Sequence, residues 1–395
     1  MSSTNPPLAS KLSGLQSSAI RDLLKLTTRA EIISLAGGLP DAELMPRERI
    51  AKAAEGALSG TGALQYTESP GWAPLRAVLA ERESARLGRV VPVDEVFVTH
   101  GSQQALSLLS EVLLDPGALV VVEDPAYVGA LQVFRAAGAR IVAVPLDAEG
   151  MRIDALRELL ARGERPAVVH TVSNFHNPGG VTMSPRRRGE LAELAEAHGF
   201  WVIEDDPYGE LWFDSPAPAP VATYSRNVIR LSSASKIIAP TLRVGWMVAP
   251  DRVCRAVELL KQGADLCGSA LTQQIAADLL ADETWLTAHV DTVRTTYSTR
   301  AKALVHAVRT AFGDRITCTD ATGGMFVWAD FADGTDTGAL LPHALNEGVA
   351  YVPGSAFAVD GAYRESMRMC FTTSDASTLE QAIDRLARAH ARAAG

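Results

Sequence analysis

The chain has 395 residues, a formal net charge of −9 and 47% hydrophobic residues. This length is typical of two to three domains, and the acidic balance disfavours a general binder of nucleic acids or membrane surfaces. No apolar run reaches the roughly 18 residues that span a bilayer, and the N-terminus lacks the apolar core of a signal peptide, so a cytoplasmic protein is expected. The four cysteines lack CxxC spacing and are expected to be buried thiols without a metal or disulfide role.

Residues 1–47 are expected to form an arm that leads into the main fold. From about residue 48, helical stretches such as 102–114 and 185–198 alternate with short runs rich in Val and Ile, which are typical of strands buried on both faces. The runs are 96–100, 118–123, 167–172, 200–205, 227–232 and 244–249. This alternation predicts an α/β fold with a mostly parallel sheet and helices on both faces.

The pattern changes after about residue 252. Residues 270–312 are predicted to be helical, and the later part of this segment is expected to connect two domains. Three apolar runs and a final helix then predict a smaller α+β unit: 325–331, 349–354, 366–372 and 377–393. The expected domains are therefore an arm at 1–47, a large domain at 48–285 and a small C-terminal domain at 286–395.

Polar and aromatic residues follow the first predicted strands, at the carboxyl ends where open α/β sheets bind ligands. Ser102 and Gln103, with Gly101 before them, form a turn whose free N–H groups suit an anion; an ordinary turn with a serine cap is the alternative. Tyr127, in EDPAY, either presents its ring to a flat ligand or is a core residue. Asn177, in NFHNPGG, either donates a hydrogen bond to a ligand oxygen or belongs to an Asn-Pro turn.

Three acids, Glu204, Asp205 and Asp206, directly follow an apolar strand. Burial of acids there is costly unless a partner is present. A carboxylate facing a protonated ring nitrogen would supply that partner, and a solvated strand end is the alternative.

Lys236 stands alone in the stretch LSSASKIIAPTLRVGW. Burial among apolar residues lowers the pKa of a lysine, and a neutral amine is the nucleophile that forms a Schiff base with an aldehyde. Ser233 and Ser235 add hydroxyl groups, and Arg243 adds a cation suited to phosphate. An anion-binding turn, an aromatic face, an amide, a strand-end acid, a lysine and an arginine together match one ligand, pyridoxal 5′-phosphate (PLP).

The sequence resembles the fold-type I, PLP-dependent aminotransferases, and in particular their kynurenine/2-aminoadipate subgroup. The resemblance runs from SLAGGLPDAELMP at 34–46 to MRMCFT at 367–372. The family pattern S-x-S-K-x-x-x-P-G-L-R-x-G-W reads S-A-S-K-I-I-A-P-T-L-R-V-G-W here. Thr241 stands in place of the usual glycine, and Gly179 in place of the threonine of N-P-T-G; neither change removes a group that the chemistry needs. The resemblance implies a seven-stranded, mostly parallel sheet and a smaller α+β domain.

The resemblance also implies a role for each candidate residue. Lys236 would form the Schiff base with PLP, and Asp205 would pair with the ring nitrogen. Tyr127 would stack on the ring, while Tyr208 and Asn177 would bind its oxygen. The phosphate would be held by a further set: Ser102, Gln103, Ser233, Ser235 and Arg243.

Four residues would complete the site on the substrate side and between subunits. Arg368 would bind the substrate's α-carboxylate, Gly38 would lie in a loop near the substrate, and Arg21 would shape the choice of side chain. Tyr66 would reach the phosphate of a neighbouring subunit, so a homodimer with shared sites is expected.

The expected activity is transfer of an amino group between an L-α-amino acid and a 2-oxo acid, with ping-pong kinetics. Another PLP reaction, such as β-elimination, decarboxylation or oxidation, is the first alternative, because a fold does not fix the reaction. The effector domain of a transcription regulator is a second; the negative charge disfavours DNA binding, and an arm that begins within the first twenty residues leaves no room for a winged helix. The sequence leaves the amino donor open, in primary or in natural-product metabolism.

Overall fold

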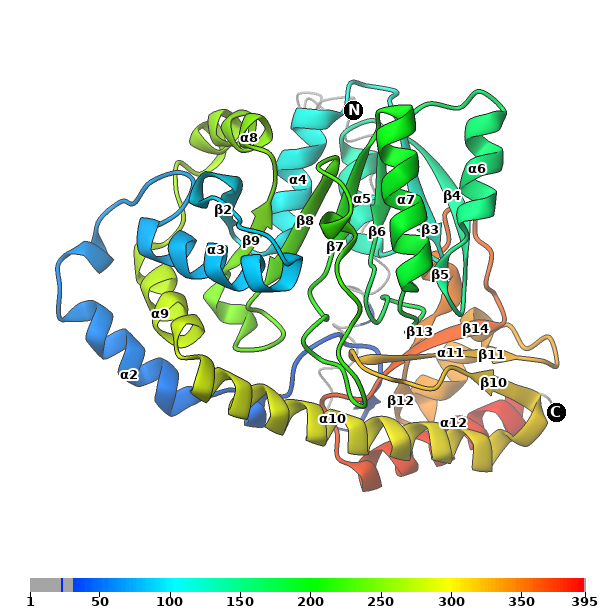
Figure 1. Cartoon of the computed structure of the whole chain (residues 1–395). Helices are drawn as coiled ribbons and strands as arrows, with labels where there is room; N and C mark the ends of the chain where they lie inside the picture. The colour runs from blue at the N-terminus through cyan, green and yellow to red at the C-terminus, as the bar shows by residue number, and fades with distance from the viewer. Residues whose placement is uncertain (1–22, 24–30, 394–395) are drawn as a thin grey trace, which may run out of the picture.

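The computed structural model describes residue 23 and residues 31–393. These residues form three sheets of eight, four and two strands, with helices packed around them (Figure 1). No helix in these ranges combines the length and the apolar composition that crossing a membrane requires.

The eight-stranded sheet has the order β2-β9-β8-β7-β6-β3-β4-β5. Its strands are β2 (Val96–Thr99), β3 (Leu119–Asp124), β4 (Arg140–Asp147), β5 (Gly150–Met151), β6 (Pro166–Thr171), β7 (Trp201–Asp205), β8 (Val228–Ser233) and β9 (Gly245–Val248). The central pairs β4–β3, β3–β6, β6–β7 and β7–β8 are parallel, whereas β2, β9 and β5 pair in the antiparallel sense. The sheet therefore has one strand more than the seven expected, although it is mostly parallel as predicted.

Side chains of the central strands alternate between two apolar layers, one on each face of this sheet. In β3, Val121 packs in one cluster with residues of α3, α7 and α9, whereas Val120 and Val122 pack in the other with residues of α4, α5 and α8. The helices are α3 (Ala73–Leu87), α4 (Ser102–Leu113), α5 (Val128–Ala136), α6 (Ile153–Ala161), α7 (Pro185–His198), α8 (Asp251–Ala264) and α9 (Ala270–Ala281). Burial on both faces explains why these strands are continuous apolar runs in the sequence.

Local signals fix several helix ends. Helix α7 begins after Ser184, whose side chain accepts a hydrogen bond from the N–H of Arg187, and it ends at Gly199, which has φ 73°. A capping serine, a proline in the first turn and a left-handed glycine at the end are strong boundary signals.

The C-terminal part contains a second, antiparallel sheet. The long helix α10 (Glu283–Phe312) leads into it, and its strands are β10 (Ile316–Cys318), β11 (Phe326–Phe331), β14 (Ser366–Cys370) and β13 (Val352–Pro353). The remaining elements are α11 (Thr337–Asn346), α12 (Ala376–Ala393), α2 (Arg47–Leu58) and the two-stranded pair of β1 (Ile33–Ser34) with β12 (Val349–Ala350). Because β1 pairs with β12, the segment after residue 31 is attached to the C-terminal part. The exact domain boundaries stay a prediction.

Candidate active site

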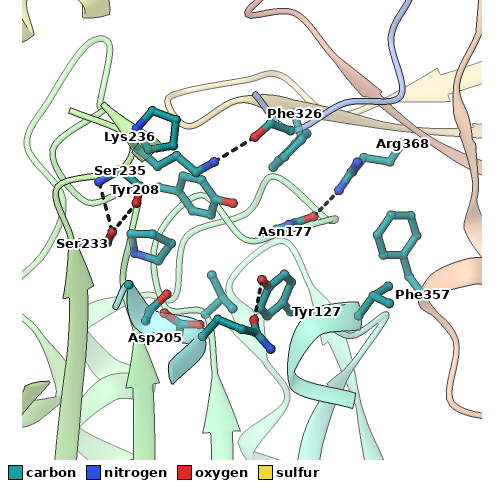
Figure 2. A pocket seen from close by; sticks show the side chains of 18 of the residues that line it. Tyr127, Asn177, Asp205, Tyr208, Ser233, Ser235, Lys236, Phe326, Phe357 and Arg368 are labelled. Carbon is teal, nitrogen blue, oxygen red and sulfur yellow. Dashed lines mark hydrogen bonds between the residues drawn. The ribbon is translucent and has the colours of Figure 1, made fainter. Parts of the chain in front are cut away.

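A cavity of about 300 Å³ lies at the carboxyl ends of the parallel strands and is also lined by residues of the C-terminal sheet (Figure 2). It brings together most of the candidate residues, although they are far apart in the sequence. The candidates that line it are Gly38, Ser102, Gln103, Tyr127, Asn177, Asp205, Tyr208, Ser233, Ser235, Lys236, Arg243 and Arg368.

Lys236 follows β8 and points into this cavity. Its Nζ donates a hydrogen bond to the carbonyl oxygen of Gly38 at 2.8 Å. Burial lowers the pKa of Lys236 to about 8, and the positive charges of Arg368 and Arg243 act in the same direction. The amine is therefore neutral at a much lower pH than that of an ordinary lysine.

Of the three predicted acids, Glu204 and Asp205 are the last residues of β7 and Asp206 follows it, and each has a different environment. Glu204 is fully buried and accepts hydrogen bonds from Ser173 Oγ at 2.7 Å and from two backbone N–H groups. Asp206 forms an ion pair of 2.8 Å with Arg230, which is also buried and which donates to Glu83 at 2.9 Å. Glu204 and Asp206 therefore have a structural role, since their hydrogen bonds and the ion pair stabilise the fold.

Asp205, between them, faces the cavity. Only 2% of it is exposed, and its Oδ1 has no hydrogen-bond partner among the described residues. Its Oδ2 lies 3.8 Å from Nε2 of His170, a second buried atom for which the described ranges supply no hydrogen bond. An unpaired buried carboxylate is costly, so this arrangement fits a ligand with a positively charged N–H group, such as the protonated ring nitrogen of PLP.

The turn before α4 is shaped for an anion. Gly245 lies so close to it that a Cβ on Gly245 would be 2.6 Å from Cα of Gly101 and 2.8 Å from N of Ser102. In the part of the chain that the structure describes, no side chain caps the N-terminus of α4, and Arg243 lies beside it, with Nη2 donating to the His100 carbonyl at 2.7 Å. Backbone N–H groups and a guanidinium beside a helix N-terminus suit a phosphate group.

Ser233 and Ser235 complete this end of the cavity. Their hydroxyl oxygens are 2.8 Å apart, and the backbone N–H of Ser235 donates to Ser233 Oγ at 3.1 Å. Figure 2 shows both side chains beside the start of the Lys236 side chain. Hydroxyl groups can rotate to donate to a phosphate oxygen, so this pair fits the same anion.

Two tyrosines line the middle of the cavity. Tyr127 donates a hydrogen bond to Oε1 of Gln103 at 3.2 Å, and burial raises its pKa to about 12. Burial also raises the pKa of Tyr208, and the nearby Tyr127 and Asp205 add to this effect. Both hydroxyl groups therefore keep their protons at neutral pH and are available as donors.

Arg368 lies on β14, opposite the parallel strands. Its Nη1 donates to Oδ1 of Asn177 at 2.8 Å, as Figure 2 shows, and its Nη2 donates to the Ala36 carbonyl at 2.7 Å. The guanidinium is 4.2 Å from the ring centre of Phe326 and 4.9 Å from that of Phe357. Burial lowers its pKa to about 10, and its Nε has no partner among the described residues, so the group remains a cation with a free donor for a carboxylate.

Among the described candidates, Tyr66 does not line this cavity. Tyr66 is 77% exposed and lies on the surface beside the segment 265–270, and Arg21 lies outside the described residues. Conversely, no motif or spacing in the sequence singles out Phe326, Phe357 or His170 as site residues. In the sequence they stand only in apolar or strand-like surroundings. The two phenylalanines approach Arg368, and His170 approaches Asp205, only in the folded chain.

Comparisons with known proteins agree with this geometry. The family described as aminotransferase class I and II matches residues 30–386. The chain is 39% identical over 385 residues to an aromatic-amino-acid aminotransferase 1 of Thermococcus litoralis, which covers 95% of this chain and 92% of that protein. It is 39% identical over 383 residues to a 2-aminoadipate transaminase of Thermus thermophilus, with coverage of 95% and 94%. The crystal structure of a kynurenine aminotransferase of Pyrococcus horikoshii superimposes with a TM-score of 0.92 at 38% identity, over 98% of both chains. The chain therefore belongs to the class I and II aminotransferases, and it is a transaminase that uses PLP.

Proposed function

We propose that Lys236, Asp205 and Arg368 are the central residues of this transaminase, which exchanges an amino group between an L-α-amino acid and a 2-oxo acid. The observation that carries the assignment is a single cavity that holds a lysine of lowered pKa, an unpaired buried carboxylate and a buried guanidinium. PLP, when bound, supplies an aldehyde that condenses with amines and a ring that accepts electrons from the substrate's Cα.

Lys236 would hold the cofactor through Nζ until an amino acid takes its place. With a pKa of about 8, the released amine is neutral in about a tenth of the molecules at pH 7. We assign to Nζ the removal of the proton from Cα and the later return of a proton, because its lowered pKa lets it both accept and donate a proton near neutral pH.

The other residues would bind and orient. Asp205 would keep a proton on the ring nitrogen, and Tyr208 and Asn177 would donate to the ring oxygen, while Tyr127 would lie against the ring. Arg368 would fix the α-carboxylate and thereby the orientation of the Cα–H bond. The remaining cofactor residues would hold the phosphate: Ser102, Gln103, Ser233, Ser235 and Arg243.

We further propose a cytoplasmic homodimer that acts in amino acid metabolism, including biosynthesis. The exposed Tyr66 supports the dimer, since a large aromatic side chain that is 77% exposed is available to contact a second subunit. Aromatic amino acids, 2-aminoadipate and kynurenine are the amino donors to test first, because they appear in the names of the relatives.

The test is incubation of the PLP-loaded enzyme with single amino acids. Formation of pyridoxamine phosphate, and its conversion back by a 2-oxo acid, is the expected result. Release of ammonia or carbon dioxide without pyridoxamine phosphate would instead indicate elimination or decarboxylation. Lys236→Arg is expected to keep the fold and lose all turnover, and retained turnover would contradict the role of Lys236.

A further inference from the structure

The loop after β6 carries a buried histidine, His176, immediately before Asn177. Only 1% of His176 is exposed. Its Nδ1 accepts a hydrogen bond from the N–H of Gly179 at 3.1 Å. Its Nε2 lies 3.0 Å from Oε2 of Glu123, although it is not aligned for a straight hydrogen bond. Because a nitrogen that accepts from a backbone amide carries no proton, the proton of the neutral ring is on Nε2, the ring nitrogen that lies beside the carboxylate.

Glu123 is a fixed partner for this histidine. It lies on β3 and is 2% exposed. Its Oε1 accepts from Thr171 Oγ1 at 2.6 Å and its Oε2 from the N–H of Val172 at 2.9 Å. Burial alone would raise the pKa of Glu123, but His176 and these donors outweigh burial and lower it, so the group stays a carboxylate. The contact therefore ties the loop to two neighbouring strands, β3 and β6.

The loop connects His176 to Arg368, the candidate carboxylate-binding residue. Asn177, the neighbour of His176, accepts from Nη1 of Arg368 at 2.8 Å. Two short backbone bonds keep the loop compact: the N–H of His176 donates to Val181 at 2.8 Å, and the N–H of Gly180 donates to the His176 carbonyl at 2.6 Å. A displacement of the His176 ring would therefore move Asn177, and Arg368 would lose or shift a hydrogen bond.

Gly179 accommodates the histidine ring. A Cβ at this position would lie 2.8 Å from Cδ2 of Leu146 and 3.2 Å from Nδ1 of His176. A side chain here would press on the ring and on its bond to the backbone. The glycine that replaces the usual threonine of N-P-T-G is thus matched to the buried His176.

We propose that the pair of His176 and Glu123 positions Asn177 and Arg368 for the α-carboxylate of the substrate. His176 does not line the cavity; it acts through Asn177 and is a positioning residue. The inference rests on the proposed role of Arg368 in binding the carboxylate.

The test compares two probes on the PLP-loaded enzyme, with binding followed by the absorbance of the cofactor. α-Methyl-L-phenylalanine has the carboxylate but no Cα proton, so it binds without turnover, and 2-phenylethylamine lacks the carboxylate. We expect His176→Phe to weaken the first probe about tenfold or more and to leave the affinity for the amine unchanged. His176→Gln places an amide nitrogen near the position of Nε2, so it should restore most of the affinity, whereas Glu123→Gln should weaken the acid probe selectively.

His390→Phe is the matched control. His390 is also buried and lies 3.2 Å from a carboxylate, that of Asp333, but it is in the C-terminal part and away from the cavity. This variant should lower the thermal stability without changing the affinity for either probe.

Two results would overturn the inference. One is wild-type affinity of His176→Phe and Glu123→Gln for the acid probe, and the other is an equal loss of affinity for both probes, which would indicate general loosening. Arg368→Lys separates this failure from that of the proposed function. If Arg368→Lys also binds the acid probe with wild-type affinity, both the proposed role of Arg368 and the inference about His176 fail. If Arg368→Lys binds the acid probe weakly while His176→Phe binds it normally, only the inference about His176 fails.

Discussion

Lys236 Nζ lies 2.8 Å from the carbonyl oxygen of Gly38, a residue 198 positions earlier in the chain. Both the neutral amine and the charged ammonium group can donate this hydrogen bond. The contact therefore holds the side chain in place even though burial lowers the pKa of Lys236. Lys236 is thus both fixed and reactive near neutral pH.

A first prediction concerns the pH dependence of cofactor capture. Because the folded apoenzyme holds Lys236 with a pKa of about 8 rather than 10.5, the rate at which it binds PLP covalently should rise with pH and level off above about pH 8. Stopped-flow absorbance between pH 6 and 10 measures this rate. A rate that still rises steeply between pH 9 and 10 would show that the lysine is not perturbed.

A second prediction separates two neighbouring acids. Asp205→Asn should weaken PLP binding by about 1.5–3 kcal/mol with little loss of apoenzyme stability, because Asp205 Oδ1 has no hydrogen-bond partner within residues 31–393. Asp206→Asn should cost about 3–5 kcal/mol of unfolding free energy, because it leaves the buried Arg230 short of one partner. Urea unfolding of the apoenzyme and PLP titration measure the two effects. Equal stability losses for both variants would contradict the distinction.

A third prediction addresses the shared site. Tyr66→Phe should lower the affinity for PLP about tenfold, because a hydrogen bond to the phosphate would be lost. If Tyr66 serves the partner's site, a mixed dimer of Tyr66→Phe and Lys236→Ala chains contains one complete site, with the lysine from one chain and the tyrosine from the other. Tight PLP binding and activity should therefore return on mixing. Without recovery after verified subunit exchange, the site would not be shared.

A fourth prediction tests the phosphate turn. Gly245→Ala should displace the backbone of Gly101 and Ser102, since the new Cβ would lie 2.6–2.8 Å from their atoms, and PLP affinity should fall at least tenfold. Gly189→Ala is the control: it lies within α7, with nothing within 4 Å of the added Cβ, and should stabilise the protein by about 0.5–1 kcal/mol. Equilibrium titration with PLP checks affinity, and calorimetry checks stability. Unchanged PLP affinity of Gly245→Ala would show that the turn tolerates the side chain.

The sequence predicted the central strands and the residues at their ends because both are local. Strand β3 begins with a continuous apolar run, and Ser102, Asn177 and Lys236 lie within six residues of the end of a strand. Strand β4 was missed because its residues are mostly half-exposed or exposed, so it has no continuous buried run, and β5 has only two residues.

The partners of these residues were not predictable in the same way. Asp205 and Asp206 look alike in the sequence, and only the position of Arg230 in the fold distinguishes them. Likewise, Phe326 and Phe357 look like ordinary apolar residues in the sequence, and only the fold brings both rings within 5 Å of the Arg368 guanidinium. Such contacts join distant segments, so periodicity and motifs carry no information about them.

The pairing of β1 with β12 has a consequence for the order in which the molecule is completed. The carbonyl of Ala36 accepts a hydrogen bond from Arg368, which lies 332 residues later in the chain. The neighbouring Leu35 donates its N–H to the Ala350 carbonyl and accepts from the N–H of Cys370. A ribosome makes every strand of the large sheet long before these partners emerge. Leu35 and Ala36 therefore make these contacts only after residues up to Cys370 have been synthesised, so the contacts that hold Arg368 form later than the strands of the large sheet can pair.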